Sequence, residues 1–419
     1  MPNIFLSNFP SICKAVCLAL TFVCLTLTAQ TVQSAKQKKL KYYDFEIHAD
    51  FSGVGSLASD DACVPVTVTV KQDRAILREL EWHDSSIFSQ FSADGELKKR
   101  KKAWRWKVPK KGGVLEYCTV LTHKRGDSYD SRVTKDWALF RADDLLPAAA
   151  SKAVRSGRAR TRLIFSLPDN WSSATRYPLV DKHTYSVRNP ERNFDRPTGW
   201  VQLGEFGVRR DIVDGTKVAI AAPFGQEVRR LEILTLLAFT LPEIKDWFEL
   251  FPERLLVVSA SDQMWRGALS GPGSLYIHGD RALVSENGTS TIVHELVHIG
   301  MQRQAVENAD WIDEGIAEYM AILLLHRAGG LTENRFNIAL DEQRQWAKQA
   351  KSLGKRNSTG AETAKAVVLF ANLHEEMGDK NFKEWVKRVA QRGEPITLAE
   401  LRRLALEVHG TAVNSLPSG

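Results

Sequence analysis

The stretch HELVHIGMQRQAVENADWIDEGIAEYM, residues 294–320, decides the fold expected for this chain. Its first residues place His294 and His298 four positions apart, which puts both imidazoles on one face of a helix, one turn apart. The neighbouring residues are mostly apolar, so the helix should be buried. Burying two imidazoles and the Glu295 carboxylate is costly unless each has a partner. A metal bound by both histidines, with Glu295 facing a catalytic water, supplies partners; histidines hydrogen-bonded in a core are the alternative.

A third metal ligand has to come from elsewhere in the chain. Catalytic zinc sites use three protein ligands and keep a fourth position open. The following helix offers Asp313, Glu314 and Glu318 in WIDEGIAEY, residues 311–319. Glu314 and Glu318 share a helix face, so one can bind the metal while the other accepts the free N–H of a ligand histidine.

HELVH followed by WIDEG resembles the gluzincin metallopeptidases of the thermolysin-like superfamily. The likeness is nearest to the aminopeptidase-N-like and glycyl-aminopeptidase-like branches. It extends upstream to FPERLLVVSA, residues 251–260, and downstream to residues 364–388. The resemblance implies a thermolysin-like zincin catalytic domain with a β-rich domain leaning on it.

Carried over by position, the resemblance implies one zinc ion per chain. His294, His298 and Glu314 would bind it, and Glu295 would be the general base. Glu318 stands where related enzymes hold an acid that supports a ligand histidine. Peptides or proteins would be the substrates.

The chain departs from the family pattern at two places. Gly273 begins the sequence GSLYI, which looks like the start of the substrate-binding edge strand, but Tyr276 stands where aminopeptidases have a glutamate that grips a free amino terminus. The family's oxyanion tyrosine should lie near Thr363, yet no tyrosine follows Tyr319. Candidates for binding substrate or the oxyanion are Tyr276, His278, Tyr319 and His326.

Outside this region the hydrophobic pattern changes along the chain. Residues 63–73 and 113–124 alternate between apolar and polar side chains, which favours an antiparallel sheet. Residues 224–248 have a helical pattern, with a stop expected at Pro242. The sequence therefore predicts an α+β protein with a β-rich N-terminal domain (residues 36–215), a zincin catalytic domain (216–330) and a helical C-terminal portion (331–419).

The N-terminus has the pattern of an export signal. Lys14 precedes an uncharged apolar run, residues 15–29, which is short for a membrane span. Residues 1–35 are interpreted as a cleaved signal peptide, with an uncleaved anchor as the alternative. We expect a periplasmic or secreted protein without stable membrane insertion. Beyond the signal only Cys63 and Cys118 remain, which form one disulfide or stay as two thiols.

The net charge of +7 only weakly favours anionic partners. The densest basic run, KKRKKAWRWKVPKK, begins at Lys98 and ends at Lys111. Its period of two favours strands near a sheet edge, with Trp104 and Trp106 on the buried face. Weak contact with an anionic surface remains open, and no nucleic acid is expected as a partner.

These features together predict an exported zinc metallopeptidase with Glu295 as general base. The alternative is a catalytically weak or inactive zinc-bound protein that binds peptides or the cell envelope. The presence of Glu295 argues against this alternative, because a purely structural zinc site does not need a base.

Overall fold

The computed structural model describes residues 40–189, 194–226, 228–302, 304–354, 357–391 and 393–417. The chain divides into residues 1–41 and a body formed by residues 42–419, and the body is described below. The signal peptide expected at residues 1–35 lies outside the described residues. Among the described helices, none combines the length and the apolar character needed to span a membrane.

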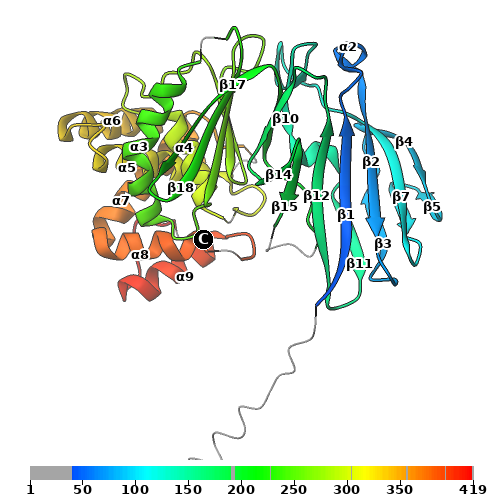
Figure 1. Cartoon of the computed structure of the whole chain (residues 1–419). Helices are drawn as coiled ribbons and strands as arrows, with labels where there is room; N and C mark the ends of the chain where they lie inside the picture. The colour runs from blue at the N-terminus through cyan, green and yellow to red at the C-terminus, as the bar shows by residue number, and fades with distance from the viewer. Residues whose placement is uncertain are drawn as a thin grey trace, which may run out of the picture. The chain divides into compact units, whose positions relative to one another are not determined.

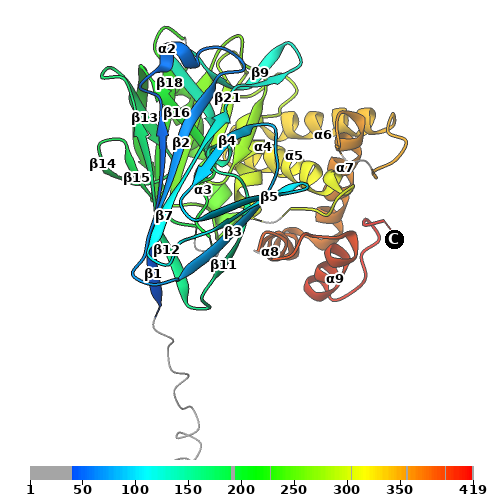
Figure 2. The same cartoon turned by 90° about the vertical axis from the view of Figure 1, so that its right-hand side faces the viewer.

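The N-terminal part of the body consists of antiparallel sheets around one core (Figures 1 and 2). The seven-stranded sheet runs β14 (Leu179–Asp181), β15 (Thr184–Val187), β12 (Gly157–Ser166), β1 (Lys41–Asp50), β2 (Cys63–Lys71), β7 (Gly112–Val120), β4 (Phe88–Ala93). The five-stranded sheet runs β13 (Ser172–Thr175), β16 (Trp200–Gly204), β10 (Trp137–Arg141), β9 (Ser128–Val133), β8 (His123–Arg125). The four-stranded sheet runs β11 (Ala149–Ala153), β3 (Leu77–His83), β6 (Ala103–Lys107), β5 (Glu96–Arg100). Two short helices, α2 (Val54–Leu57) and the 3-10 helix η1 (Ala142–Leu145), join strands.

Alternating side chains explain the strands of the largest sheet. In β2 the valines at every second position, Val64 to Val70, are buried while the residues between them are more exposed. Cys63 and Cys118 form a disulfide between β2 and β7. Of the two states left open for these cysteines, the structure therefore has the disulfide.

The basic run forms the β5–β6 hairpin, with β5 at the edge of its sheet. Trp106 is fully buried and Trp104 half-buried, as the period of two predicts. Several cations of the run are already paired, since Lys99 contacts Asp84 and Arg105 contacts Glu81.

A separate five-stranded sheet is formed by residues 206–278. Its order is β17 (Phe206–Val213), β18 (Thr216–Pro223), β19 (Arg254–Ala260), β21 (Ser274–His278), β20 (Ala268–Gly271). The three central strands are parallel, and the two outer strands are antiparallel to their neighbours. The expected domain boundary at residue 215 is therefore too late, because β17 pairs with β18 along its whole length and belongs to this sheet.

The two faces of this sheet pack against different layers. Leu275 and Ile277 of β21 join the core formed with the helices. Tyr276, between them, joins a core with Trp200 and Leu139 of the N-terminal strands. The sheet is thus a middle layer, with the N-terminal strands on one side and the helices on the other (Figure 1).

The helical layer consists of α3 (Arg230–Trp247), α4 (Thr291–Gly300), α5 (Asp310–Arg327), α6 (Glu333–Ala347), α7 (Ala361–Met377), α8 (Asp379–Val389) and α9 (Leu398–His409). The expected stop at Pro242 is wrong, because α3 continues through the proline. An interior proline costs about 3 kcal/mol, but Ile244 and Trp247, which follow it, are both fully buried in the core. At α9 the Thr397 hydroxyl accepts a hydrogen bond from Glu400 N and caps the helix. The α+β class with C-terminal helices is confirmed.

Candidate zinc site

The first helix of the site, α4, is fixed by its cap and by its apolar faces. The Ser290 side chain accepts a hydrogen bond from Val293 N at 3.4 Å and begins the helix. Ile292, Val293 and Leu296 are buried in the helical core. The remaining face presents His294 and His298 to a cavity.

Three side chains from α4 and α5 converge on one point. His294 Nε2 lies 3.1 Å from His298 Nε2. Each of these nitrogens lies 3.4 Å from a carboxylate oxygen of Glu314. For zinc bonds of about 2.0–2.1 Å, neighbouring ligands of a tetrahedral site lie about 3.3–3.4 Å apart. The two Nε2 atoms face different oxygens of Glu314, Oε2 for His294 and Oε1 for His298, and the separations match the spacing of ligands around one zinc ion.

Glu318 orients the first of the two histidines. Its Oε2 lies 2.8 Å from His294 Nδ1. A carboxylate only accepts hydrogen bonds, so Nδ1 donates its proton to Glu318, and Nε2 is the ring nitrogen that would bind a metal. Spacing alone left Glu314 and Glu318 interchangeable, and the contacts distinguish them: Glu314 lies beside both Nε2 atoms, whereas Glu318 lies behind one ring.

The site attracts positive charge. Burial disfavours the imidazolium form of His294, but hydrogen bonds to Glu314 and Glu318 outweigh it and raise the pKa of His294 well above its usual value. Burial likewise opposes ionisation of Glu314, but hydrogen bonds from His294 and His298 hold the pKa of Glu314 below its usual range. A divalent cation would satisfy the same acids, and its binding would displace protons from the ligands.

Glu295 lies beside these ligands and lines the same cavity. Its side chain is only 7% exposed. Within the described part of the chain it makes no hydrogen bond or ion pair, so its oxygens are available for a proton from water. This is the environment that a general base needs.

The cavity has a volume of about 1970 Å³ and takes its walls from both parts of the body. The α4 and α5 side carries the zinc-type ligands. The N-terminal side contributes Trp200, and strand β20 contributes Ala268–Gly271. The edge strand beside the cavity is therefore β20. Assigning that role to the sequence at Gly273 is wrong, because β21 is paired on both sides, with β19 and with β20.

Two of the candidate substrate residues lie on the other face of the sheet. Tyr276 is fully buried, and its hydroxyl donates a hydrogen bond to Trp265 O at 2.8 Å. His278 is 1% exposed and lies 3.3 Å from Asp262. Neither side chain lines the cavity, so the structure does not bring them to the zinc-type ligands.

The candidates on and after α5 also lie away from the ligands. The Tyr319 hydroxyl is 2.6 Å from His374 Nδ1 inside the helical layer. His326 contacts Leu331 O, at the end of α5. Thr363 lies 3.2 Å from Ser358, and of these residues only Ser358 lines the cavity. Sequence reasoning missed Ser358, which precedes α7 in a loop with no recognisable motif.

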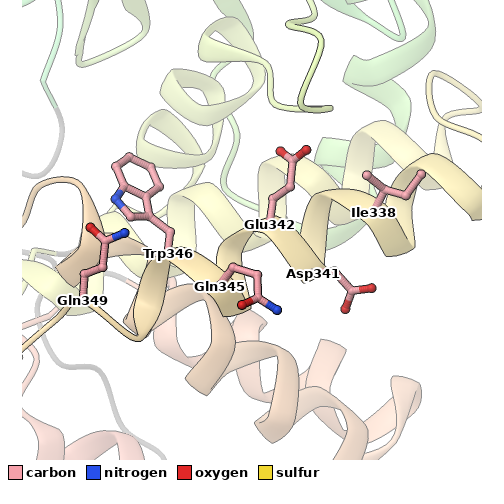
Figure 3. Close-up of a pocket in the computed structure, with 6 residues that line it drawn as sticks. All are labelled: Ile338, Asp341, Glu342, Gln345, Trp346 and Gln349. Atoms are coloured by element: carbon pink, nitrogen blue, oxygen red, sulfur yellow. The ribbon is translucent and has the colours of Figure 1, made fainter.

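A smaller hollow of about 420 Å³ lies on the outer surface of α6 (Figure 3). Its lining residues lie on this helix or directly after it: Ile338, Asp341, Glu342, Gln345, Trp346 and Gln349. No histidine or cysteine is among them, and Figure 3 shows their side chains spread along the helix rather than pointing toward one another. The large cavity is the better candidate for a reaction site.

No family model matches the chain, and no curated protein matches it. Similarity appears among solved structures. An aminopeptidase N family protein from Idiomarina loihiensis is 15% identical, with a TM-score of 0.59, over 88% of this chain and 71% of its own. A mutant two-domain M1 zinc metallopeptidase bound to L-arginine is 16% identical, with a TM-score of 0.58, over 90% of this chain and 95% of its own.

A third similar structure is a mutant M1 zinc metallopeptidase from Deinococcus radiodurans bound to a Tyr-Ser-Ala substrate. It is 16% identical, with a TM-score of 0.56, over 88% of this chain and 92% of its own. At such low identity the similarity concerns the fold. The sheets, the middle layer and the helices described above are thus arranged as in the two-domain M1 zinc metallopeptidases, the aminopeptidase-N-like structures that the sequence resembles.

Proposed function

We propose that this chain is a zinc metallopeptidase that hydrolyses peptide bonds, with Glu295 as its general base. The observation that carries the proposal is the convergence of His294, His298 and Glu314 at separations of 3.1–3.4 Å. The unpartnered carboxylate of Glu295 lies beside them in the same cavity. The M1 zinc metallopeptidase fold supports the same reaction class.

Each residue of the site has a distinct task in this reaction. A bound zinc ion would supply a Lewis acid that polarises the scissile carbonyl and activates water at neutral pH. Glu295 takes a proton from the water while the water oxygen adds to the carbonyl carbon. When the C–N bond breaks, Glu295 passes that proton to the leaving amine. The products are a carboxylic acid and an amine, while Glu318 keeps the His294 ring in its orientation.

A zinc-bound protein that binds peptides without cleaving them is the second candidate. It is favoured by the positions of Tyr276 and Tyr319, neither of which lines the cavity. Losing an oxyanion donor typically costs about 10²–10³ in rate. Ser358 and Thr359, which do line the cavity, precede the expected tyrosine position near Thr363 by only a few residues.

Cleavage-site profiling distinguishes the two candidates. Parent protein, Glu295→Gln and the matched surface variant Glu342→Gln are loaded with zinc and incubated with mixed peptides, and the products are identified by mass spectrometry. We expect cleavage by the parent and by Glu342→Gln, and about 10²–10⁴-fold slower cleavage by Glu295→Gln. Equal rates for Glu295→Gln and the parent would remove the general-base role. Intact peptides in every reaction would favour the binding protein.

We also propose that the protein acts in the periplasm or after secretion. The disulfide between Cys63 and Cys118 supports an oxidising compartment. Fractionation of producing cells, with thiol labelling of each fraction, tests the proposal. The oxidised protein should be found outside the cytoplasm; reduced cytoplasmic protein would contradict it.

A further inference from the structure

Six arginines other than Arg266 line the cavity that contains the zinc-type ligands. Four come from the N-terminal strands and loops and two from the catalytic region, and we call them the arginine wall: Arg125, Arg141, Arg176, Arg188, Arg254 and Arg281. They are spread over a long stretch of sequence, and only the fold brings them to one cavity.

The arginine wall is not engaged in direct contacts with acids. Within the described residues, none of its six side chains forms an ion pair. Arg266, which also lines the cavity, differs because it pairs with Asp262 at 2.5 Å. Asp143, an acid on the N-terminal side of the cavity, lies 3.6 Å from Arg196 and accepts a hydrogen bond from Gly199 N. The six guanidinium groups of the wall therefore lie outside ion-pairing distance of the described carboxylates, although Asp143 and Glu253 line the same cavity.

Aromatic rings hold three of these guanidinium groups. Arg125 lies 3.7 Å from the centre of the Trp265 ring. Arg141 lies 5.2 Å from the Trp200 ring, which is almost fully buried. A guanidinium held over a ring keeps its planar edge of N–H donors for a ligand. These arginine side chains lose conformational entropy on folding rather than on ligand binding, which strengthens binding.

Arg176 is the third, and it lies next to the turn between β20 and β21. It is 5.0 Å from the ring of Tyr177 and donates a hydrogen bond to Thr198 at 3.1 Å. Gly273 has a φ of +59°, which favours glycine, and a Cβ atom here would come within 2.9 Å of Arg176 Nε. Trp200, whose ring lies beneath Arg141, donates its ring N–H to Leu269 O of β20. Arg141 is therefore also held next to this edge strand.

We propose that the arginine wall is a binding subsite for carboxylate groups, so that the cavity selects acidic peptides. The inference rests on the proposed function and names its substrate class. A carboxylate accepts two parallel hydrogen bonds from a guanidinium, which a neutral amide does not reproduce. The carboxylate of Glu295, beside the zinc-type ligands, repels the same group and directs it toward the arginines. The carboxylate comes from an acidic side chain or from the peptide C-terminus.

Binding to zinc-loaded full-length Glu295→Gln protein tests this proposal without requiring turnover. Three labelled peptides of equal length are compared by fluorescence anisotropy: one rich in glutamate, its glutamine counterpart, and the counterpart with an amidated C-terminus. We expect the glutamate peptide to bind about ten- to hundred-fold more tightly than its counterpart. A further loss of affinity when the C-terminus is amidated would assign part of the binding to the terminal carboxylate. Equal binding of all three would overturn the proposal.

Variants made in the same Glu295→Gln background locate the effect. Arg141→Gln and Arg176→Gln should each reduce the preference for the acidic peptide about tenfold or more. Arg402→Gln, an exposed arginine on α9, should leave it unchanged. Arg176→Lys keeps the charge but lacks the planar fork, and it should retain only part of the preference. An undiminished preference in both glutamine variants would contradict the assignment.

Two outcomes separate this inference from its alternatives. If the parent cleaves neither peptide while the binding preference remains, the proposed hydrolysis fails and the carboxylate subsite stands. If the parent cleaves acidic and neutral peptides equally well, hydrolysis stands and the subsite fails.

A single-stranded oligonucleotide should not displace the acidic peptide at equal concentration. Displacement would overturn the proposal in favour of a polyanion site.

Discussion

Among single residues, Glu318 has the contact on which the order of the zinc-type ligands depends. Its carboxylate lies 2.8 Å from His294 Nδ1 and is only partly accessible to solvent. Removing it leaves the ring free to rotate and its Nδ1 proton without an acceptor. Partners of this kind typically contribute about 10–100-fold to metal affinity.

We therefore predict that Glu318→Ala weakens zinc binding about 10–100-fold while one zinc still binds at saturation. Competition against a chromophoric chelator measures the affinity. Glu342→Ala, on the exposed face of α6, serves as the control and should match the parent. Unchanged affinity in Glu318→Ala would show that His294 does not need this partner.

The sequence predicts some residues of the site and misses others for a physical reason. Helical periodicity alone places His294 and His298 together, and the next helix limits the third ligand to a few acids. Choosing Glu314 over Glu318 depends on the approach of α5 to α4, which spacing does not determine. The arginine wall has no periodic pattern, so only the assembled cavity reveals it.

Among the elements, α5 and α7 approach closely at Gly315, the residue after Glu314. A Cβ atom at this position would lie 2.4 Å from Ala366 Cβ and 3.0 Å from Phe370. Alanine in an open helix is about 1 kcal/mol better than glycine. In this close contact the crowding outweighs that gain, because inserting atoms into a packed core costs about 1–3 kcal/mol.

We predict that Gly315→Ala lowers the thermal midpoint and weakens zinc binding, since the added methyl group pushes α5 and its ligand away from α7. Gly55→Ala, on the short helix α2, is the control because nothing lies within 4 Å of its added carbon. Calorimetry with excess zinc measures both midpoints. An equal or higher midpoint for Gly315→Ala would contradict the predicted close packing.

The predictions for elements fail where tertiary contacts outweigh local preference. Pro242 predicts a helix end, but burial of Ile244 and Trp247 carries α3 onward. The sequence from Gly273 reads as an edge strand, yet β20 folds back and covers that edge. By contrast, residues 311–319 lie within α5, as the sequence predicts, because the apolar pattern is strong and continuous.

At the scale of the whole molecule, the disulfide and the zinc-type site belong to different layers. Cys63 and Cys118 link β2 and β7 of the N-terminal sheets, while the zinc-type ligands lie on α4 and α5. Closing a loop with a sequence separation of 55 residues stabilises a protein by about 2–4 kcal/mol. The effect should be confined to the layer that contains the disulfide.

We predict that Cys63→Ala/Cys118→Ala unfolds at lower denaturant concentration and keeps its zinc content. Denaturation followed by tryptophan fluorescence gives the first quantity, and metal analysis of the folded protein gives the second. The parent under oxidising conditions is the reference. Loss of zinc from the folded double variant would show that the layers are more tightly coupled than their contacts indicate.

The walls of the cavity come from parts of the chain that lie far apart in the sequence. Its zinc-type side comes from one continuous stretch, residues 294–318, whereas its other walls include the N-terminal strands, β20, residues 250–254 and residues 358–359. Local patterns predict the first and say nothing about the second. The proposed preference for acidic peptides therefore depends on how the N-terminal strands pack against the middle sheet.

Zinc content per chain is the measurement that tests the central claim most directly. Native mass spectrometry of the purified protein, after dialysis against zinc and then against metal-free buffer, should show one zinc ion per chain in the parent and in Glu295→Gln. His298→Ala should show none, because it removes one of three ligands. A parent without zinc, or a His298→Ala variant with as much zinc as the parent, would contradict the assignment of His294, His298 and Glu314 as the zinc site.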